Sequence, residues 1–295
     1  MKPKSIMFVC MTRHEANQHL IRQLKKIYDP GEAMHIADLI MEKITGKSRV
    51  DRLAGLNEKI SGSDQELLEK YTSELLTSKP VQYVLNETWF AGMKLYVDEN
   101  VLIPRPETEE LVEWVIEEVK SETKNLSLLD VGTGSGCIAI ALKKKLPHLN
   151  VYAIDISEKA LAVAKKNALQ NNADITFIQM NILDDNKWKE LREFDVIVSN
   201  PPYVPEEDKN TMHDNVARFE PHLALFVPDN DPLIFYKTLA GLAKNKGEKI
   251  FVEISDRFPD ETRDIFLKQG FSETIIRKDI NNNPRMIYSR LTIDD

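Results

Sequence analysis

LLDVGTGSGCIAIAL (residues 128–142) places an apolar strand, a glycine-rich turn and an Ala/Ile/Leu-rich helix in direct succession. Glycine allows the sharp turn from strand to helix and lets a ligand approach the backbone closely. The spacing is G-x-G-x-G, whereas pyrophosphate cradles use G-x-G-x-x-G, and no Gly-Lys-Ser/Thr follows. The run therefore predicts a ligand-binding turn in an α/β sheet and disfavours a nucleotide-phosphate site.

An acidic residue, Asp155, follows 19 residues after Gly136, at the end of the next predicted strand. A carboxylate at that place can accept hydrogen bonds from both hydroxyls of a ribose. Asp130 adds a second negative charge near the turn, which favours a cationic nucleoside over a phosphate. S-adenosylmethionine is such a nucleoside, and we expect Asn181, just past the third strand, at the amino edge of its adenine.

Strands and helices alternate around this turn. Apolar, β-branched runs predict strands at residues 127–131, 151–155, 175–179, 194–199 and 249–254, with a last pair at 272–278 and 285–291. Helical spacing predicts helices at 137–146, 157–169, 232–245 and 260–269. Such alternation predicts a mostly parallel sheet with helices on both faces.

The earlier part of the chain has a different pattern. Segments 17–29, 32–46 and 64–76 space their apolar residues as helices do, which predicts a small all-α helical bundle domain at residues 1–78. Residues 79–103 carry β-branched and aromatic side chains around Gly92 and are expected to form a β-hairpin linker. In the remaining domain, residues 104–295, Pro104 and Pro106 predict an extended entry, and Thr108 is expected to cap the helix that follows.

Composition excludes several classes of protein. The 295 residues include no apolar run near the ~20 needed to span a bilayer, and the patch at residues 6–11 is too short for a signal peptide. The two cysteines, Cys10 and Cys137, rule out a disulfide framework or a thiolate zinc site and fit a reducing cytosol. The formal charge of −8 divides into +2 for residues 1–80 and −10 for the rest, which disfavours nucleic acid as the main ligand.

A second motif, Asn200-Pro201-Pro202-Tyr203, follows the predicted strand at residues 194–199. Ligands bind beyond the carboxyl ends of the strands in open α/β sheets, so the tetrad is expected beside the glycine turn. The prolines stiffen the turn and leave the Pro201 carbonyl free, the Asn200 side chain supplies a second acceptor, and Tyr203 supplies an aromatic wall. Two acceptors and a flat wall fit a planar amino group, as in an amide or a base, and can stabilise the charge that develops when its nitrogen attacks.

These motifs, taken with PVQYVLNETWFAG (80–92), VLIPRPETEELV (101–112), FEPHLALF (219–226), FVEI (251–254) and RMI (285–287), resemble the HemK/PrmC family of protein-(glutamine-N5) methyltransferases that modify release factors. The resemblance runs from about Pro80 to the end of the chain. It implies a class I, Rossmann-like, seven-stranded methyltransferase domain preceded by a helical domain that recognises the protein substrate. The implied substrate is the glutamine of the Gly-Gly-Gln motif in peptide-chain release factors 1 and 2.

The resemblance also implies roles for individual residues. Methyl-donor binding falls to Gly132, Thr133, Gly134, Ser135, Gly136, Asp155, Asn181, Ile182 and Asn200. Glutamine binding and catalysis fall to Asn200, Pro201, Pro202 and Tyr203, and Arg105 and Glu107 are expected near the cofactor and the substrate entrance. The implied cofactor is S-adenosyl-L-methionine, and the implied partners are release factors, for a cytoplasmic monomer without metal, membrane or direct nucleic-acid contact.

The chain departs from the family's usual pattern at a few places. Asn86 stands where a glycine is usual, Asn181 replaces an acidic residue, and residues 226–231 lack the usual glycine-rich turn. Ile182 is smaller than usual, so Trp188 is expected to take its place against the adenine. Three other functions remain open: a ribosomal-protein glutamine methyltransferase, a DNA adenine-N6 methyltransferase that grips a flipped base, and a cofactor-binding interaction module without activity. The charge of −10 disfavours the DNA enzyme, and the intact tetrad disfavours the module.

Overall fold

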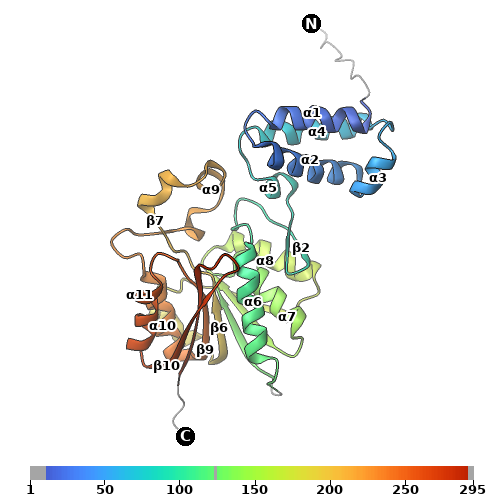
Figure 1. The fold of residues 1–295 in the computed structure, drawn as a ribbon. Helices are drawn as coiled ribbons and strands as arrows, with labels where there is room; N and C mark the ends of the chain where they lie inside the picture. The colour runs from blue at the N-terminus through green and yellow to red at the C-terminus, as the bar shows by residue number, and fades with distance from the viewer. Residues whose placement is uncertain (1–10, 123–124, 292–295) are drawn as a thin grey trace. The chain divides into compact units, whose positions relative to one another are not determined.

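The computed structural model describes residues 11–122 and 125–291 and divides into two compact units, with the boundary between Asn86 and Glu87 (Figure 1). Cys10 and residues 6–10 of the apolar patch lie outside the described residues. Among the residues that are described, no helix is long and apolar enough to cross a membrane.

The first unit is helical, as its periodicity predicts. Its helices are α1 (Arg13–Leu24), α2 (Pro30–Thr45), α3 (Arg49–Ala54), α4 (Gly62–Leu75) and α5 (Val81–Leu85). Thr12 and Ser61 begin α1 and α4 with capping boxes, and the Asp29 side chain accepts hydrogen bonds from two backbone N–H groups at the start of α2. Each such cap stabilises its helix by ~1 kcal/mol. Apolar side chains of α1, α2, α4 and α5 form one core cluster.

The segment expected as a hairpin linker differs from the prediction in its first part. Residues 81–85 form helix α5, and two of its side chains, Val84 and Leu85, belong to the core of the helical unit. Pro80 begins this helix, and Asn86 ends it with a φ of 52°, in the left-handed region that asparagine tolerates. The valines therefore serve a helix, not a strand. The hairpin is confined to β1 (Thr88–Phe90) and β2 (Met93–Leu95).

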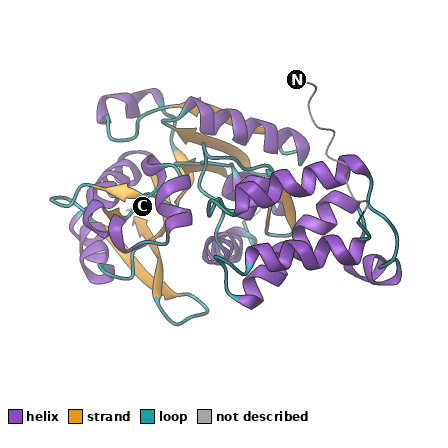
Figure 2. Ribbon diagram, turned by 90° about the horizontal axis from the view of Figure 1, so that it is seen from above, coloured by secondary structure: helices purple, strands orange, loops and turns teal. Residues whose placement is uncertain are grey.

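A seven-stranded sheet forms the centre of the second unit (Figures 1 and 2). Its strand order is β10-β11-β9-β6-β3-β4-β5, and only β11 runs antiparallel to its neighbours. The strands are β3 (Ser127–Val131), β4 (Asn150–Asp155), β5 (Ile175–Gln179), β6 (Phe194–Ser199), β9 (Gly247–Glu253), β10 (Phe271–Lys278) and β11 (Pro284–Leu291). The predicted mostly parallel sheet is confirmed.

Helices cover both faces of this sheet. They are α6 (Pro106–Val119), α7 (Cys137–Lys145), α8 (Glu158–Gln170), α10 (Ile234–Lys246) and α11 (Pro259–Lys268). Successive strand residues point to opposite faces, so Leu128 packs in the cluster that contains α6 and α7, and Leu129 packs in the cluster that contains α10 and α11. Strands buried on both sides must be apolar throughout, which is why their sequence signal is strong.

Shorter elements fill the connections. They are the 3-10 helices η1 (Asp185–Glu190), η2 (Glu206–Thr211) and η3 (His222–Ala224), helix α9 (Asp214–Phe219), and the paired strands β7 (Val204–Pro205) and β8 (Phe226–Val227). Most of them lie between β6 and α10. Because β3 lies between β4 and β6, the glycine turn, Asp155 and the Asn-Pro-Pro-Tyr tetrad all emerge at one edge of the sheet.

Candidate active site

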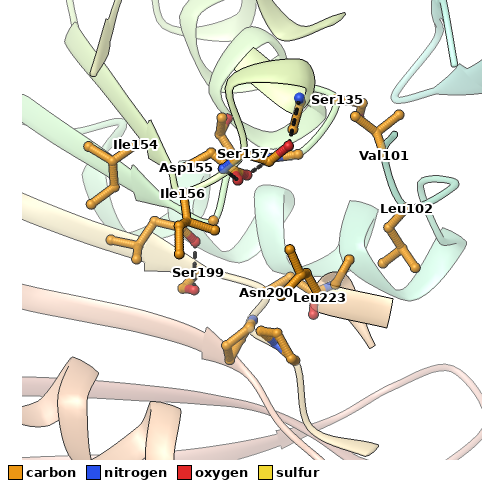
Figure 3. A pocket seen from close by; sticks show the side chains of 18 of the residues that line it. Val101, Leu102, Ser135, Ile154, Asp155, Ile156, Ser157, Ser199, Asn200 and Leu223 are labelled. Atoms are coloured by element: carbon orange, nitrogen blue, oxygen red, sulfur yellow. Dashed lines mark hydrogen bonds between the residues drawn. The ribbon is translucent and has the colours of Figure 1, made fainter. Parts of the chain in front are cut away.

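A cavity of about 250 Å³ lies at the carboxyl ends of β3, β4 and β6 (Figure 3). Its walls come from the segment before α6, the glycine turn, the loops after β4 and β5, the start of the tetrad, and η3. The predicted site residues that line it are Arg105, Gly132, Thr133, Gly134, Ser135, Asp155, Asn181, Ile182, Asn200, Pro201 and Pro202. Glu107, Gly136 and Tyr203 do not line the cavity, so these three cannot act there as walls.

All three glycines of the turn have positive φ angles: 72° at Gly132, 54° at Gly134 and 82° at Gly136. Residues that carry a Cβ atom strongly disfavour a positive φ angle, which explains why the turn requires glycine. A Cβ atom on Gly132 would meet nothing within 4 Å, so the backbone there is open to a ligand. On Gly136, in contrast, a Cβ would lie 3.1 Å from Cδ1 of Ile140 and 3.2 Å from Cβ of Ala164. Gly136 therefore serves the close packing of α7 on α8.

Asp155, at the end of β4, holds the turn in place. Its Oδ2 accepts a hydrogen bond from Gly134 N at 2.9 Å, and its Oδ1 accepts one from Ser157 N at 2.9 Å. Burial raises the pKa of Asp155, and these backbone hydrogen bonds oppose that rise. Figure 3 shows Asp155 and Ser157 on one side of the cavity, with Asn200 and Leu223 on the other. Carboxylate oxygens have further lone pairs, so Asp155 can bind a ligand without releasing the turn.

Asp130 lies behind the turn and is only 1% exposed. Its Oδ2 accepts hydrogen bonds from Thr133 Oγ1 at 2.7 Å and Ala139 N at 3.3 Å, whereas Oδ1 has no partner among the described residues. Burial, together with the charge of Asp155, raises the pKa of Asp130 to about 7. Burial and the charge of Asp130 in turn raise the pKa of Cys137 to about 12, so its thiol is not a nucleophile.

The loop after β5 contributes Asn181 and Ile182 to the cavity. Asn181 is exposed, and its Oδ1 accepts a hydrogen bond from Leu183 N at 3.0 Å, which leaves that oxygen one further acceptor position. The prediction that Trp188 replaces Ile182 is wrong. Trp188 lies outside the cavity wall and donates its Nε1–H to the carbonyl oxygen of Ile182 at 2.9 Å. Gly241 makes room for the indole, since a Cβ there would lie 3.3 Å from the ring.

Asn200, Pro201 and Pro202 of the tetrad contribute to the opposite wall. Ser199 Oγ donates to the carbonyl oxygen of Val131 at 2.8 Å and so ties the end of β6 to the end of β3. Asn200 Nδ2 donates to Thr108 Oγ1 at 3.0 Å. Within residues 11–122 and 125–291, no hydrogen bond occupies Oδ1 of Asn200 or the carbonyl oxygen of Pro201. Two acceptors from adjacent residues are therefore available beside the cavity.

Tyr203 does not form the predicted aromatic wall. Its ring packs against the core cluster of α10 and α11, and its hydroxyl donates to Oε1 of Glu253 at 3.2 Å. Glu253, the last residue of β9, is 1% exposed, and its Oε2 accepts from Thr108 Oγ1 at 2.7 Å. Glu253 is not among the site residues predicted from the sequence, although an acidic residue at the end of a buried strand is a usable signal. Thr108 also differs from its prediction. Helix α6 begins at Pro106 without a side-chain cap, so the Thr108 hydroxyl is free for Glu253.

An ion pair supports the rim of the cavity, by which we mean residues 100–105 before α6 and residues 221–224 around η3. The Glu220 side chain, 1% exposed, accepts from Arg105 Nη2 at 2.6 Å and from Ile103 N at 3.2 Å. It thereby joins the segment before α6 to the segment that continues into η3, and both segments line the cavity. Glu107 is half-buried beside this region, and its charge adds to the effect of burial in raising the pKa of Glu253.

Comparison with known proteins connects this geometry to a family. Residues 15–85 match the profile of the PrmC N-terminal domain, and residues 111–224 match that of the methyltransferase small domain. A release factor glutamine methyltransferase of Flavobacterium psychrophilum is 47% identical over 90% of this chain and 95% of its own length. A protein of the same name from Bacteroides thetaiotaomicron is 39% identical over 90% of this chain and 96% of its own length.

Among solved structures, the hMettl16 catalytic domain, determined with a hairpin of the MAT2A 3'UTR, has a TM-score of 0.54 at 16% identity. It covers 79% of this chain and 84% of its own, and this likeness concerns the fold alone. The predicted class I, Rossmann-like methyltransferase fold is confirmed. From its family profiles, its relatives and its fold, the chain belongs to the release factor glutamine methyltransferase (PrmC) family, and it is a methyltransferase.

Proposed function

We propose that the protein transfers a methyl group from S-adenosylmethionine to the side-chain amide nitrogen of the glutamine in the Gly-Gly-Gln motif of peptide-chain release factors 1 and 2. The names of the relatives support this substrate. The observation that carries the proposal is that Asn200 and Pro201 border the same cavity as Gly134 and Asp155. An amide-binding corner therefore adjoins a turn suited to a nucleoside.

The cavity fits S-adenosylmethionine chemically. Asp155 would accept hydrogen bonds from the ribose hydroxyls, and the open backbone at Gly132 would lie against the ligand. Asp130 lies behind the turn and outside the cavity wall, where it accepts a hydrogen bond from the Thr133 hydroxyl and so supports the turn. Ile156 and Ile182 supply apolar surface for a flat base. When bound, S-adenosylmethionine supplies a methyl group on a positively charged sulfur.

The tetrad would prepare the substrate nitrogen. An amide nitrogen is a weak nucleophile because its lone pair is delocalised into the carbonyl group. Asn200 Oδ1 and the Pro201 carbonyl would each accept one N–H of the glutamine amide, which fixes the direction of the nitrogen lone pair and stabilises the positive charge that develops on it. The extra proton can leave to water after the transfer, so the site needs no strong base.

The direct test incubates the purified protein with labelled methyl donor and a purified release factor, and then locates the methyl group by mass spectrometry. We expect one methyl group on the glutamine of the Gly-Gly-Gln motif. A release factor in which that glutamine is replaced by glutamate has no amide nitrogen and should stay unlabelled. Ribosomal protein and duplex DNA, tested in parallel, represent the two rival substrates. Preferential labelling of either one would refute the proposal.

A further inference from the structure

We infer that Thr108 and Glu253 are positioning residues that orient the Asn200 carboxamide so that its oxygen, and not its nitrogen, is available to the substrate amide. The inference rests on the proposed function, because it concerns the group that would grip the glutamine. The three side chains come from separate elements: Thr108 from the first turn of α6, Glu253 from the end of β9 and Asn200 from the end of β6. Both supporting residues are at most 2% exposed.

Thr108 has a single hydroxyl proton, and the partner of that proton decides how Asn200 is oriented. A carboxylate can only accept hydrogen bonds, so the contact of 2.7 Å between Thr108 Oγ1 and Glu253 Oε2 commits that proton to Glu253. The other oxygen of Glu253 accepts from the Tyr203 hydroxyl, so two hydroxyl groups donate to this side chain. Burial raises the pKa of Glu253, and these two hydrogen bonds and the positive charge of Arg285 oppose that rise and favour the carboxylate. Thr108 Oγ1 then has only lone pairs left for Asn200.

The amide group of Asn200 must therefore turn its nitrogen toward Thr108. Nδ2 donates to Oγ1 at 3.0 Å, which leaves Oδ1 as the remaining polar atom of the carboxamide. The reversed orientation would place Oδ1 against an oxygen that has no proton to give, and the hydrogen bond between Asn200 and Thr108 would be lost. It would also present N–H groups to a substrate that itself offers N–H groups. The buried carboxylate thus selects the orientation that suits an amide substrate.

The test compares Thr108→Val with Thr108→Ser in the full-length protein. Valine keeps the shape of threonine but removes the acceptor for Asn200, whereas serine keeps it. Thr262→Val is the matched control, because Thr262 is fully buried and, among the residues that the structure describes, its hydroxyl bonds only to the carbonyl oxygen of Phe258, at the start of its own helix. For each variant we would measure kcat and KM with a purified release factor and the Kd for S-adenosylmethionine by calorimetry.

We expect Thr108→Val to lower kcat by about 10-fold to 100-fold, with the Kd for the cofactor within about two-fold of the wild type. Thr108→Ser should recover most of the lost kcat, and Thr262→Val should leave every value unchanged. A Thr108→Val protein with wild-type kcat would overturn the inference. So would a serine variant as inactive as the valine variant, or a parallel loss of cofactor binding.

A second variant covers the case in which Thr108→Val fails to fold. In Glu253→Gln, the new amide can donate to Thr108, whose proton is then free for Asn200 Oδ1, so both orientations become accessible and kcat should fall while the cofactor Kd stays constant. An unchanged kcat would again overturn the inference. A wild-type protein that does not methylate glutamine would instead refute the proposed function itself, and the role of the two positioning residues would fall with it.

Discussion

The carboxamide oxygen of Asn200 is the single group on which the proposed reaction depends most, because it lines the cavity and carries no internal hydrogen bond among the described residues. Removing it in Asn200→Ala takes away one of the two acceptors that would hold the substrate amide. We expect turnover to fall by about 100-fold or more, with the cofactor Kd changed only a few-fold. Steady-state assays with a release factor and calorimetry with S-adenosylmethionine check the two parts. Retained turnover would show that Asn200 does not grip the amide.

Asp130 offers a second test at a single residue, because burial raises its pKa to about 7 from its usual 3.8. Between about pH 4 and 7 the unfolded chain ionises this group and the native protein does not, so its contribution to the free energy of unfolding falls as pH rises through that range. Asp130→Asn has no such titration, and its amide oxygen can still accept from Thr133 and Ala139.

The measurement is urea unfolding of both proteins without cofactor across that pH range. We expect the variant to gain stability relative to the wild type as pH rises toward 7, by on the order of a few kcal/mol, and the difference to level off above it. The titration of all other groups affects the stability of both proteins equally, so it cancels in the difference between them. Parallel pH profiles for the two proteins would contradict the raised pKa.

At the scale of elements, the rim of the cavity depends on one buried carboxylate. Glu220 bonds Arg105 and the backbone of Ile103, so Glu220→Ala releases the segment before α6 from the segment that continues into η3. We expect a loss of about 1–2 kcal/mol in the free energy of unfolding, less than for a fully buried ion pair because Arg105 is 34% exposed. We also expect weaker cofactor binding, since both segments line the cavity.

The matched control for this prediction is Glu117→Ala, which removes the ion pair between Glu117 and Arg277 on the exposed surface of the same unit. It should change the free energy of unfolding by less than about 0.5 kcal/mol and leave cofactor binding unchanged. Urea denaturation and calorimetry measure both variants. Equal effects from the buried and the exposed pair would show that Glu220 does not support the rim.

The elements differ in how far the sequence alone could predict them. Inner strands of the central sheet such as β3 and β6 are buried on both faces and have apolar sequences, so their positions and the glycine turn could be predicted from local sequence. Helix α5 did not, because its valines suit a strand locally and only packing in the helical unit makes them helical. Glu253 was not predicted as a site residue for a related reason. Its partners Thr108 and Tyr203 are distant in sequence, and only the folded sheet brings their hydroxyls to one carboxylate.

For the whole molecule, we propose that the two units have separate tasks, cofactor binding in the second and recognition of the protein substrate in the first. A truncation that tests this should end at Asn86 and not at residue 78. Cutting at residue 78 would leave helix α5 on the second unit, with Val84 and Leu85 stripped of the helices they pack against. Removal of residues 1–86 takes the complete helical cluster away and keeps the whole cavity wall, which begins at Asn100.

We expect this truncated protein to bind S-adenosylmethionine with nearly the affinity of the full chain, because every residue that lines the cavity remains. Activity on an intact release factor should fall by about 10-fold or more, since the lost contacts would supply binding energy remote from the reacting nitrogen. A short peptide that contains Gly-Gly-Gln is the matched substrate, because it offers no surface for the helical unit. Both forms of the protein should methylate it equally slowly. If the truncated protein kept full activity on the intact release factor, the helical unit would have no part in substrate recognition, and the specificity would have to lie in the cavity and its rim.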